Sequence, residues 1–92
     1  MKKRSVRIIV RGKVQGVYFR HSTQMKAEEL GIKGIVKNLP GGEVYIEAEG
    51  EVNEMEEFIA WCRDEGSHSS IVSGIQVEEQ PAKGYTRFDI VR

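Results

Sequence analysis

Alternating hydrophobic and polar positions predict five strands in this chain. Val6, Ile8 and Val10 alternate with polar residues, which is the period-2 pattern of a strand with one buried face. The same alternation predicts four further strands: 32–38, 43–49, 71–77 through Ile71, Ser73, Ile75 and Val77, and 86–90 through Thr86, Phe88 and Ile90. Because Leu39-Pro40-Gly41-Gly42 separates the second strand from the third, we expect these two to form an antiparallel hairpin.

Two segments have the spacing of amphipathic helices instead. The helix predicted over 21–30 places Thr23, Ala27 and Leu30 at i, i+4 and i+7, with Gly31 at its C-terminus. A second helix over 53–65, with Asn53 as N-cap and Gly66 after its end, has an apolar stripe of Met55, Phe58, Ile59 and Cys62.

The predicted order of elements, β-α-β-β-α-β with a short terminal strand, is that of the ferredoxin-like sandwich. This α+β fold has an antiparallel sheet of four to five strands with two helices on one face. We expect a single domain over residues 5–92, since a chain of 92 residues, 39% of them hydrophobic, suffices for one core only. Periodicity alone leaves other α+β topologies open, and the sandwich hosts RNA binders, regulatory ligand domains, metal chaperones and small enzymes.

Charge and cysteine content exclude several classes of protein. The 14 basic and 14 acidic residues cancel, so no overall positive charge favours nucleic acid or an anionic membrane. A single cysteine, Cys62, allows neither an internal disulfide nor a multi-cysteine zinc site. No apolar run approaches the roughly 20 residues of a membrane span, and no signal-peptide core follows Met1-Lys2-Lys3-Arg4. We therefore expect a cytoplasmic protein that binds neither membrane nor nucleic acid, and its small size and mixed charge favour a monomer.

Basic residues are concentrated in the first part of the chain. Residues 1–37 contain ten Lys and Arg against two Glu, and the remainder carries the opposite net charge. If the fold interleaves the two parts, most of this asymmetry is solvated surface. Any anion site is nonetheless expected within the first 40 residues.

The segment 15–20 is the candidate for such a site. It joins a strand to the first turn of a helix, where successive N–H groups and the positive end of the helix dipole suit an anion the size of phosphate. Arg20 adds a planar guanidinium that can bind two phosphate oxygens. No Gly-Lys-Ser/Thr follows, and Gly12 and Gly16 are wrongly spaced for a dinucleotide fingerprint. A glycine-containing turn beside an arginine can also be only a turn, so both interpretations stay open at this point.

Two motifs in the right order resemble those of the acylphosphatase family. Residues 12–20, Gly-Lys-Val-Gln-Gly-Val-Tyr-Phe-Arg, resemble its first signature. Residues 34–38, Gly-Ile-Val-Lys-Asn, resemble its second signature, a strand that ends in Asn. The resemblance covers essentially the whole chain, with further matches at Thr23, Ala27, Glu49-Gly50, Phe58 and Trp61.

The resemblance implies hydrolysis of the carboxyl-phosphate anhydride of an acyl phosphate to carboxylate and inorganic phosphate, without a metal or organic cofactor. Arg20 matches the family's phosphate-binding arginine, and Asn38 matches its water-positioning asparagine. The positions whose backbone amides surround the phosphate match Gly16, Val17, Tyr18 and Phe19.

The sequence departs from the family pattern at three places, none of which includes Arg20 or Asn38. The family often has an aromatic residue at the position of Ile35, an Asp-Gly or Asn-Gly turn at Gly41-Gly42, and Gly-Pro at Gly66-Ser67. We expect these differences to affect strand packing and two loops, and through them the turnover rate, rather than the reaction class.

A non-catalytic binding module on the same fold is the alternative. An RNA-recognition domain requires exposed aromatics in a basic-aromatic run on its central strands, and here the third strand offers only Tyr45. A module for a small anion is harder to distinguish, because a phosphate site can bind without hydrolysis. The Asn38 amide separates the two, since only the hydrolase needs it.

The other reactive side chains favour structural roles. His21, in a first helical turn beside Arg20, is expected at the surface rather than as a general base. His68 has no second ligand at metal-binding spacing, and Cys62 is expected to be a small buried hydrophobe. Tyr18 and Phe19 could stack on an acyl group, but at least one of them is expected in the core.

Overall fold

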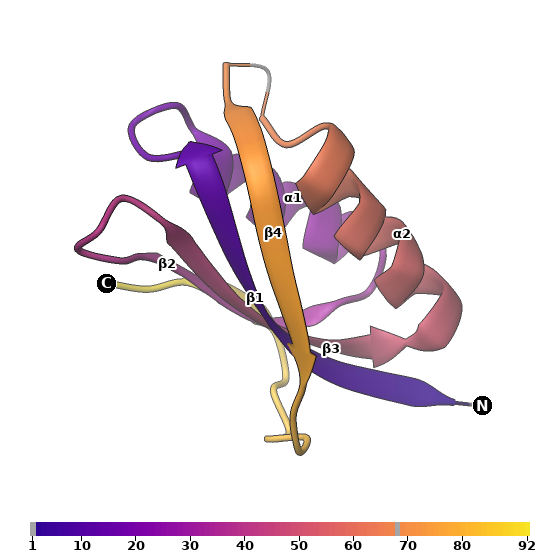
Figure 1. Cartoon of the computed structure of the whole chain (residues 1–92). Coiled ribbons are helices and arrows are strands. Elements are labelled where there is room, and N and C mark those ends of the chain that lie inside the picture. The colour runs from indigo at the N-terminus through magenta and orange to yellow at the C-terminus, as the bar shows by residue number, and fades with distance from the viewer. Residues whose placement is uncertain (1, 68) are drawn as a thin grey trace.

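The computed structural model describes residues 2–67 and 69–92 and confirms the predicted order of elements (Figure 1). The elements are β1 (Lys3–Lys13), α1 (Phe19–Glu29), β2 (Lys33–Asn38), β3 (Val44–Glu51), α2 (Val52–Asp64), β4 (Ile71–Glu79) and β5 (Phe88–Ile90). No helix in the described part of the chain is long and apolar enough to cross a membrane.

The strands form one sheet in the order β4-β1-β3-β2-β5. The β1–β3, β1–β4 and β2–β3 pairs are antiparallel, as predicted, but β5 lies parallel to β2, so the sheet is mixed rather than antiparallel throughout. The reason lies in the connection. Because β4 ends at the end of the sheet where β2 begins, a chain that returns from there along the far edge runs in the direction of β2.

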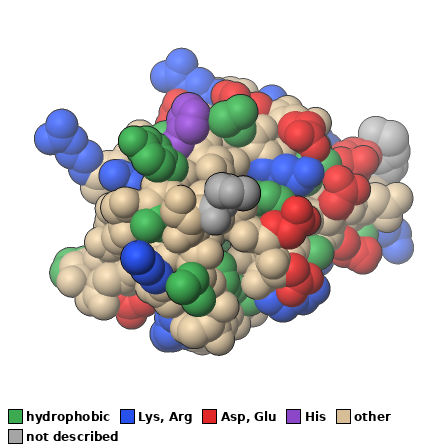
Figure 2. Space-filling model, turned by 90° about the horizontal axis from the view of Figure 1, so that it is seen from above, with side chains coloured by type: hydrophobic (Ala, Val, Ile, Leu, Met, Phe, Trp, Pro, Cys, Tyr) green, Lys and Arg blue, Asp and Glu red, His purple; other side chains and the backbone are tan. Residues whose placement is uncertain are grey.

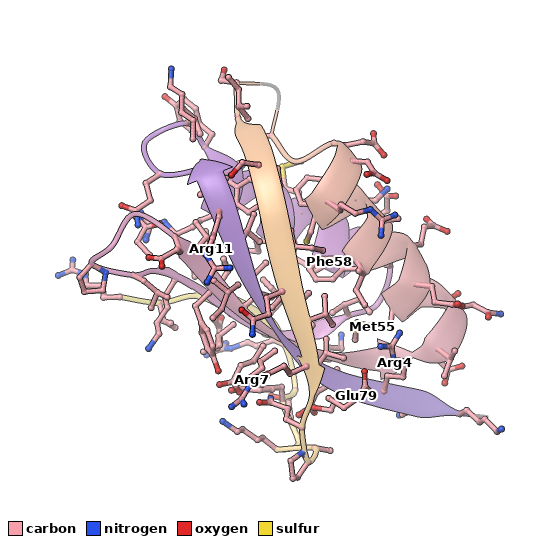
Figure 3. All side chains as sticks on the ribbon, viewed as in Figure 1. Arg4, Arg7, Arg11, Met55, Phe58 and Glu79 are labelled. Atoms are coloured by element: carbon pink, nitrogen blue, oxygen red, sulfur yellow. The ribbon has the colours of Figure 1, made fainter. Side chains whose placement is uncertain are left out.

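Both helices cover one face of the sheet, as predicted (Figure 1). Met55 and Phe58 point from α2 toward the strands (Figure 3). The inward residues of the strands and helices are almost fully buried and form one hydrophobic core, whose largest members are Phe19, Phe58, Phe88, Ile8, Ile32, Ile46 and Met55. The strands, in which every second side chain faces inward, and the helices, in which inward side chains recur about every 3.6 residues, therefore share one core layer between the sheet and the helices.

A bulge in β4 changes which of its residues face the core. The register with β1 shifts between Arg11 and Gly12, so that Ser73 is an extra residue in β4. Ile71, predicted to share a face with Ile75 and Val77, is consequently 66% exposed, and Val72 packs against the core instead.

The start of α2 also differs from the prediction. The helix begins at Val52, directly after β3, and its N-cap is Glu51, which makes no side-chain capping bond. The Val52 N–H donates to the carbonyl of Lys2, the residue before β1, at 3.1 Å, so this amide is satisfied and Asn53 is not the N-cap. Gly31 and Gly66 follow the two helices in left-handed conformations, as expected of helix C-termini.

Ion pairs join the basic and acidic parts of the sequence across the sheet. Arg4 pairs with Glu79 and Arg7 with Glu78 (Figure 3 labels Arg4 and Glu79). Both pairs connect β1 with β4, two adjacent strands from opposite ends of the chain. The fold thus interleaves the two parts of the chain, and these residues form solvated surface pairs of small energetic worth.

The crossing segment, residues 80–87, passes over the sheet face that the helices leave open, where two carboxylates hold it. Glu49 accepts hydrogen bonds from the backbone N–H groups of Lys83, Gly84 and Tyr85. Glu47, only 6% exposed, accepts from the side chains of Tyr45, Gln80, Lys83 and Tyr85. Burial by itself would raise the pKa of Glu47, but these four donors outweigh it and lower the pKa to about 2.

We predict that protonation of Glu47 weakens the fold in acid. Its pKa in the folded state, about 2, lies below the ordinary 4.5, so the stabilisation is present above pH 4.5 and is lost as the pH falls toward 2. Glu47→Gln should lower the free energy of unfolding at pH 7 by about 1–3 kcal/mol and flatten its decline in acid. Urea unfolding between pH 7 and pH 2 measures both effects. Glu57→Gln, at an exposed site on α2, is the control, and equal curves for the two variants would contradict the prediction.

Candidate active site

The loop between β1 and α1 has an unusual backbone. Gly16 has φ 72° and Tyr18 has φ 62°, both in the left-handed region. Tyr18 is the one non-glycine residue with positive φ in the described part of the chain, and it is also the N-cap of α1. A side chain in this region costs on the order of 1–3 kcal/mol, and such strain is concentrated at functional sites.

The backbone amides of residues 16–20 are free to bind a ligand. None of them donates a hydrogen bond to another group among residues 2–67 and 69–92, and the N-cap provides no side-chain acceptor. The first turn of α1 contains no acidic residue. N–H groups without an acceptor bind anions when they lie at the positive end of a helix dipole. A loop that contains residues in the left-handed conformation, as this one does, favours such an arrangement.

A cleft of about 330 Å³ lies beside this loop. Val14 and Ile90 form apolar walls, and the rest of the lining comes from Gly16, Tyr18, Phe19, Arg20 and His21. The lining contains no carboxylate, and Arg20 forms no ion pair within the described residues. Figure 2 views this end of the molecule, and the acidic side chains visible there lie mostly on the side of α2. The guanidinium of Arg20 therefore remains available to an anion in the cleft.

Asn38 lies at the same end of the molecule, in the last position of β2. The side-chain amide of Gln15 donates to the carbonyls of Leu39 and Glu43 at 2.8 Å each, which ties the loop to the turn that follows Asn38. Asn38 does not itself line the cleft, but Ile90, which does, pairs with Val36 two residues earlier on the same strand. The Asn38 Oδ1 is buried and accepts no hydrogen bond from the described residues.

The adjacent aromatic residues have opposite environments. Phe19 is 1% exposed and stacks on Trp61 with ring centroids 5.8 Å apart, whereas Tyr18 is 81% exposed at the cleft. Of the two, Phe19 is therefore the core residue. Val17, the one residue of 16–20 that does not line the cleft, is partly buried against the core.

The remaining candidates do not form a second site. Burial raises the pKa of the Cys62 thiol far above its ordinary value, which keeps it a neutral core residue, as predicted. His21 is exposed at the rim of the cleft, and His68 lies outside the described residues. Within residues 2–67 and 69–92, no three His, Cys, Asp or Glu side chains are grouped to hold a metal ion.

Two residues of this region were not found from the sequence as part of the site. Ile90 and Ser67 gave no signal there, because tertiary folding alone brings them to the loop. Gln15 belongs to the candidate segment 15–20, but its hydrogen bonds to the turn after Asn38 were not predicted.

Fold and cleft together define a small ferredoxin-like α+β domain with a place for an anion, and comparison with known proteins identifies its family. The acylphosphatase family matches residues 6–90, so the chain belongs to it. An acylphosphatase of Rubrobacter xylanophilus is 48% identical over 82 residues, which cover 89% of this chain and 74% of the relative. One of Methylococcus capsulatus is 42% identical over 95% of both chains. The crystal structure of acylphosphatase from Bacillus subtilis superposes with a TM-score of 0.93 at 41% identity, covering 99% of this chain and 100% of that one. The chain is thus a hydrolase of a family that acts on small acyl phosphates.

The unpartnered Asn38 carboxamide leads to a prediction about stability. A buried acceptor without a partner costs about 1–3 kcal/mol, so removing it relieves a penalty. We expect Asn38→Ala to leave the free energy of unfolding unchanged or to raise it by up to about 1 kcal/mol. Gln15→Ala removes two hydrogen bonds to carbonyls that each keep one backbone donor, and the loss of these two bonds should lower it by about 1–3 kcal/mol. Urea unfolding at neutral pH compares the variants, and a larger loss for Asn38→Ala than for Gln15→Ala would refute this account.

Proposed function

We propose that Arg20 and the backbone amides of Gly16, Val17, Tyr18 and Phe19 hold the phosphoryl group of an acyl phosphate, while Asn38 positions the attacking water. The supporting observation is that Arg20, without a carboxylate partner among the described residues, shares one cleft with loop amides that have no other acceptor there. The substrate accordingly carries its negative charge at the phosphoryl end, and hydrolysis yields a carboxylate and inorganic phosphate.

The chemistry of an acyl phosphate suits so small a site. The leaving group is a carboxylate whose conjugate acid has a pKa of about 4, close to that of free Asp or Glu, so it departs without a strong general acid. What remains is to bind the phosphoryl oxygens, offset their charge as the bond breaks and place water in line behind phosphorus. The guanidinium and the amides perform the first two tasks. The cleft therefore needs no titrating residue, and we propose that the reaction proceeds without a metal or cofactor.

Asn38 performs the third task through its side-chain oxygen. Oδ1 is buried and accepts no hydrogen bond from the described residues, so a water that enters from the neighbouring cleft supplies its missing donor and is held with a lone pair toward phosphorus. A carboxamide is a poor base, so the water keeps its proton until late in the reaction. The proton then passes to a phosphoryl oxygen of the substrate.

The open face of the sheet argues against the alternative of RNA binding. Tyr45, the aromatic residue expected there, donates its hydroxyl hydrogen to Glu47, and the crossing segment covers part of this face. The two carboxylates beneath that segment, Glu47 and Glu49, repel a phosphate backbone. We accordingly propose that the protein binds acyl phosphates and no nucleic acid. We also propose that it is a cytoplasmic monomer with one domain over residues 5–92.

Hydrolysis of benzoyl phosphate tests the assignment. Arg20→Ala should raise KM and lower kcat by about 10³-fold or more, because it removes a charged group that stabilises the transition state. Asn38→Ala should lower kcat while inorganic phosphate still inhibits competitively, because only the water loses its partner. A chelator should change neither constant.

Arg11→Ala is the matched control for charge, because Arg11 is an exposed arginine on β1 that does not line the cleft (Figure 3). Circular dichroism verifies that each variant is folded. Full activity in folded Arg20→Ala or Asn38→Ala would remove the role assigned to that residue. Phosphate binding by a wild-type protein that hydrolyses no acyl phosphate would favour the non-catalytic anion module.

A further inference from the structure

Ser67 contacts the candidate site from behind. It lies in the loop between α2 and β4, is 4% exposed, and its hydroxyl donates to the Val17 carbonyl at 2.8 Å. The contact is made by the side-chain hydroxyl, so it depends on the serine that this chain carries.

The geometry of the peptide bond transmits this contact to the cleft. The Val17 carbonyl and the Tyr18 N–H belong to one planar trans peptide unit, in which the two groups point in opposite directions. Ser67 does not line the cleft that contains Arg20. A hydrogen bond that draws the Val17 carbonyl toward Ser67 consequently turns the Tyr18 N–H away from Ser67, and Tyr18 is one of the residues that line the cleft.

Hydrogen bonds and packing hold Ser67 and its described neighbours Gly66 and Ser70. The Ser67 carbonyl accepts from the Ser70 N–H at 3.0 Å and from the Ser70 hydroxyl at 2.8 Å. Gly66 has φ 61°, and a Cβ there would lie 2.9 Å from Cε1 of Phe19, so the loop packs closely on the ring that follows Tyr18 in sequence. Ser67 is thus a fixed donor against a strained backbone.

We propose that Ser67 is a positioning residue, which holds the Tyr18 peptide unit in the orientation that presents its N–H to the phosphoryl group. The proposal rests on the function proposed above for the loop amides. It accounts for how Tyr18, a non-glycine residue, is kept at positive φ.

The test compares Ser67→Ala with Ser70→Ala, which loosens the same loop but leaves the bond to Val17 in place. Ser67→Ala should raise both KM for benzoyl phosphate and the inhibition constant of inorganic phosphate by about 3- to 10-fold, the worth of one hydrogen bond. The Ser70→Ala variant should stay within twofold of wild type in both constants. Ser67→Thr, which keeps the hydroxyl, should restore most of the binding.

A second readout does not need hydrolysis. In the nuclear magnetic resonance spectrum of the free protein, the coupling between the Tyr18 amide and Hα protons reports φ, and the heteronuclear Overhauser effect of that amide reports its mobility. Both should change in Ser67→Ala and stay at wild-type values in Ser70→Ala.

Unchanged Tyr18 couplings and unchanged phosphate inhibition in folded Ser67→Ala would overturn the positioning role, and wild-type hydrolysis would still support the proposed function. The positioning role would also be overturned if Ser67→Thr had wild-type thermal stability but bound benzoyl phosphate and inorganic phosphate as weakly as Ser67→Ala. If the wild type neither hydrolysed acyl phosphates nor bound phosphate, the proposed function would fail, and the Tyr18 measurements would still decide whether Ser67 orients this peptide unit.

Discussion

The burial of Phe19 is the interaction on which the geometry of this end of the molecule depends. Its ring lies in the core against Trp61, which fixes the first residue of α1 relative to α2. Burying such a ring contributes roughly 1.5–3 kcal/mol, which offsets a cost of about 1–3 kcal/mol for a left-handed residue. Because Phe19 directly follows Tyr18, this packing supports the left-handed backbone at Tyr18. The packing thereby stabilises a loop whose amides have no acceptor among the described residues.

The distribution of charge complements this backbone. The net charge of the chain is zero, and many of its cations have a carboxylate partner: Arg4, Arg7, Lys26, Arg63, Lys83 and Arg87 all form ion pairs. Arg20 forms none within the described residues, and the cleft that it lines contains no acidic group. The attraction for an anion is thus local, because a guanidinium and a helix N-terminus act at one place on a molecule without an overall field.

Features encoded by neighbouring residues could be predicted from the sequence, whereas features formed between distant segments could not. The hairpin of β2 and β3, both helices and the loop with Arg20 follow from local periodicity or from one continuous motif. The parallel pairing of β5 depends on a crossing segment held by Glu47 and Glu49, which lie over 30 residues earlier. The alternation through Ile71 continues in the sequence, but the bulge at Ser73 reverses it in space. Likewise Asn53 has the right chemistry for an N-cap, yet the carbonyl of Lys2, which lies 50 residues earlier in the sequence, already satisfies the first amide of α2.

The contribution of Ile90 to the cleft has a consequence for the order in which the protein matures. The loop and Arg20 are translated early, but one wall of their cleft belongs to β5, and β1 acquires one of its two neighbours only when β4 is complete. During synthesis on the ribosome, the emerging chain therefore holds an unfinished cleft until β5 has left the exit tunnel. The cleft and the sheet are then completed together, so that a chain without β5 lacks both an edge strand and one wall of the cleft.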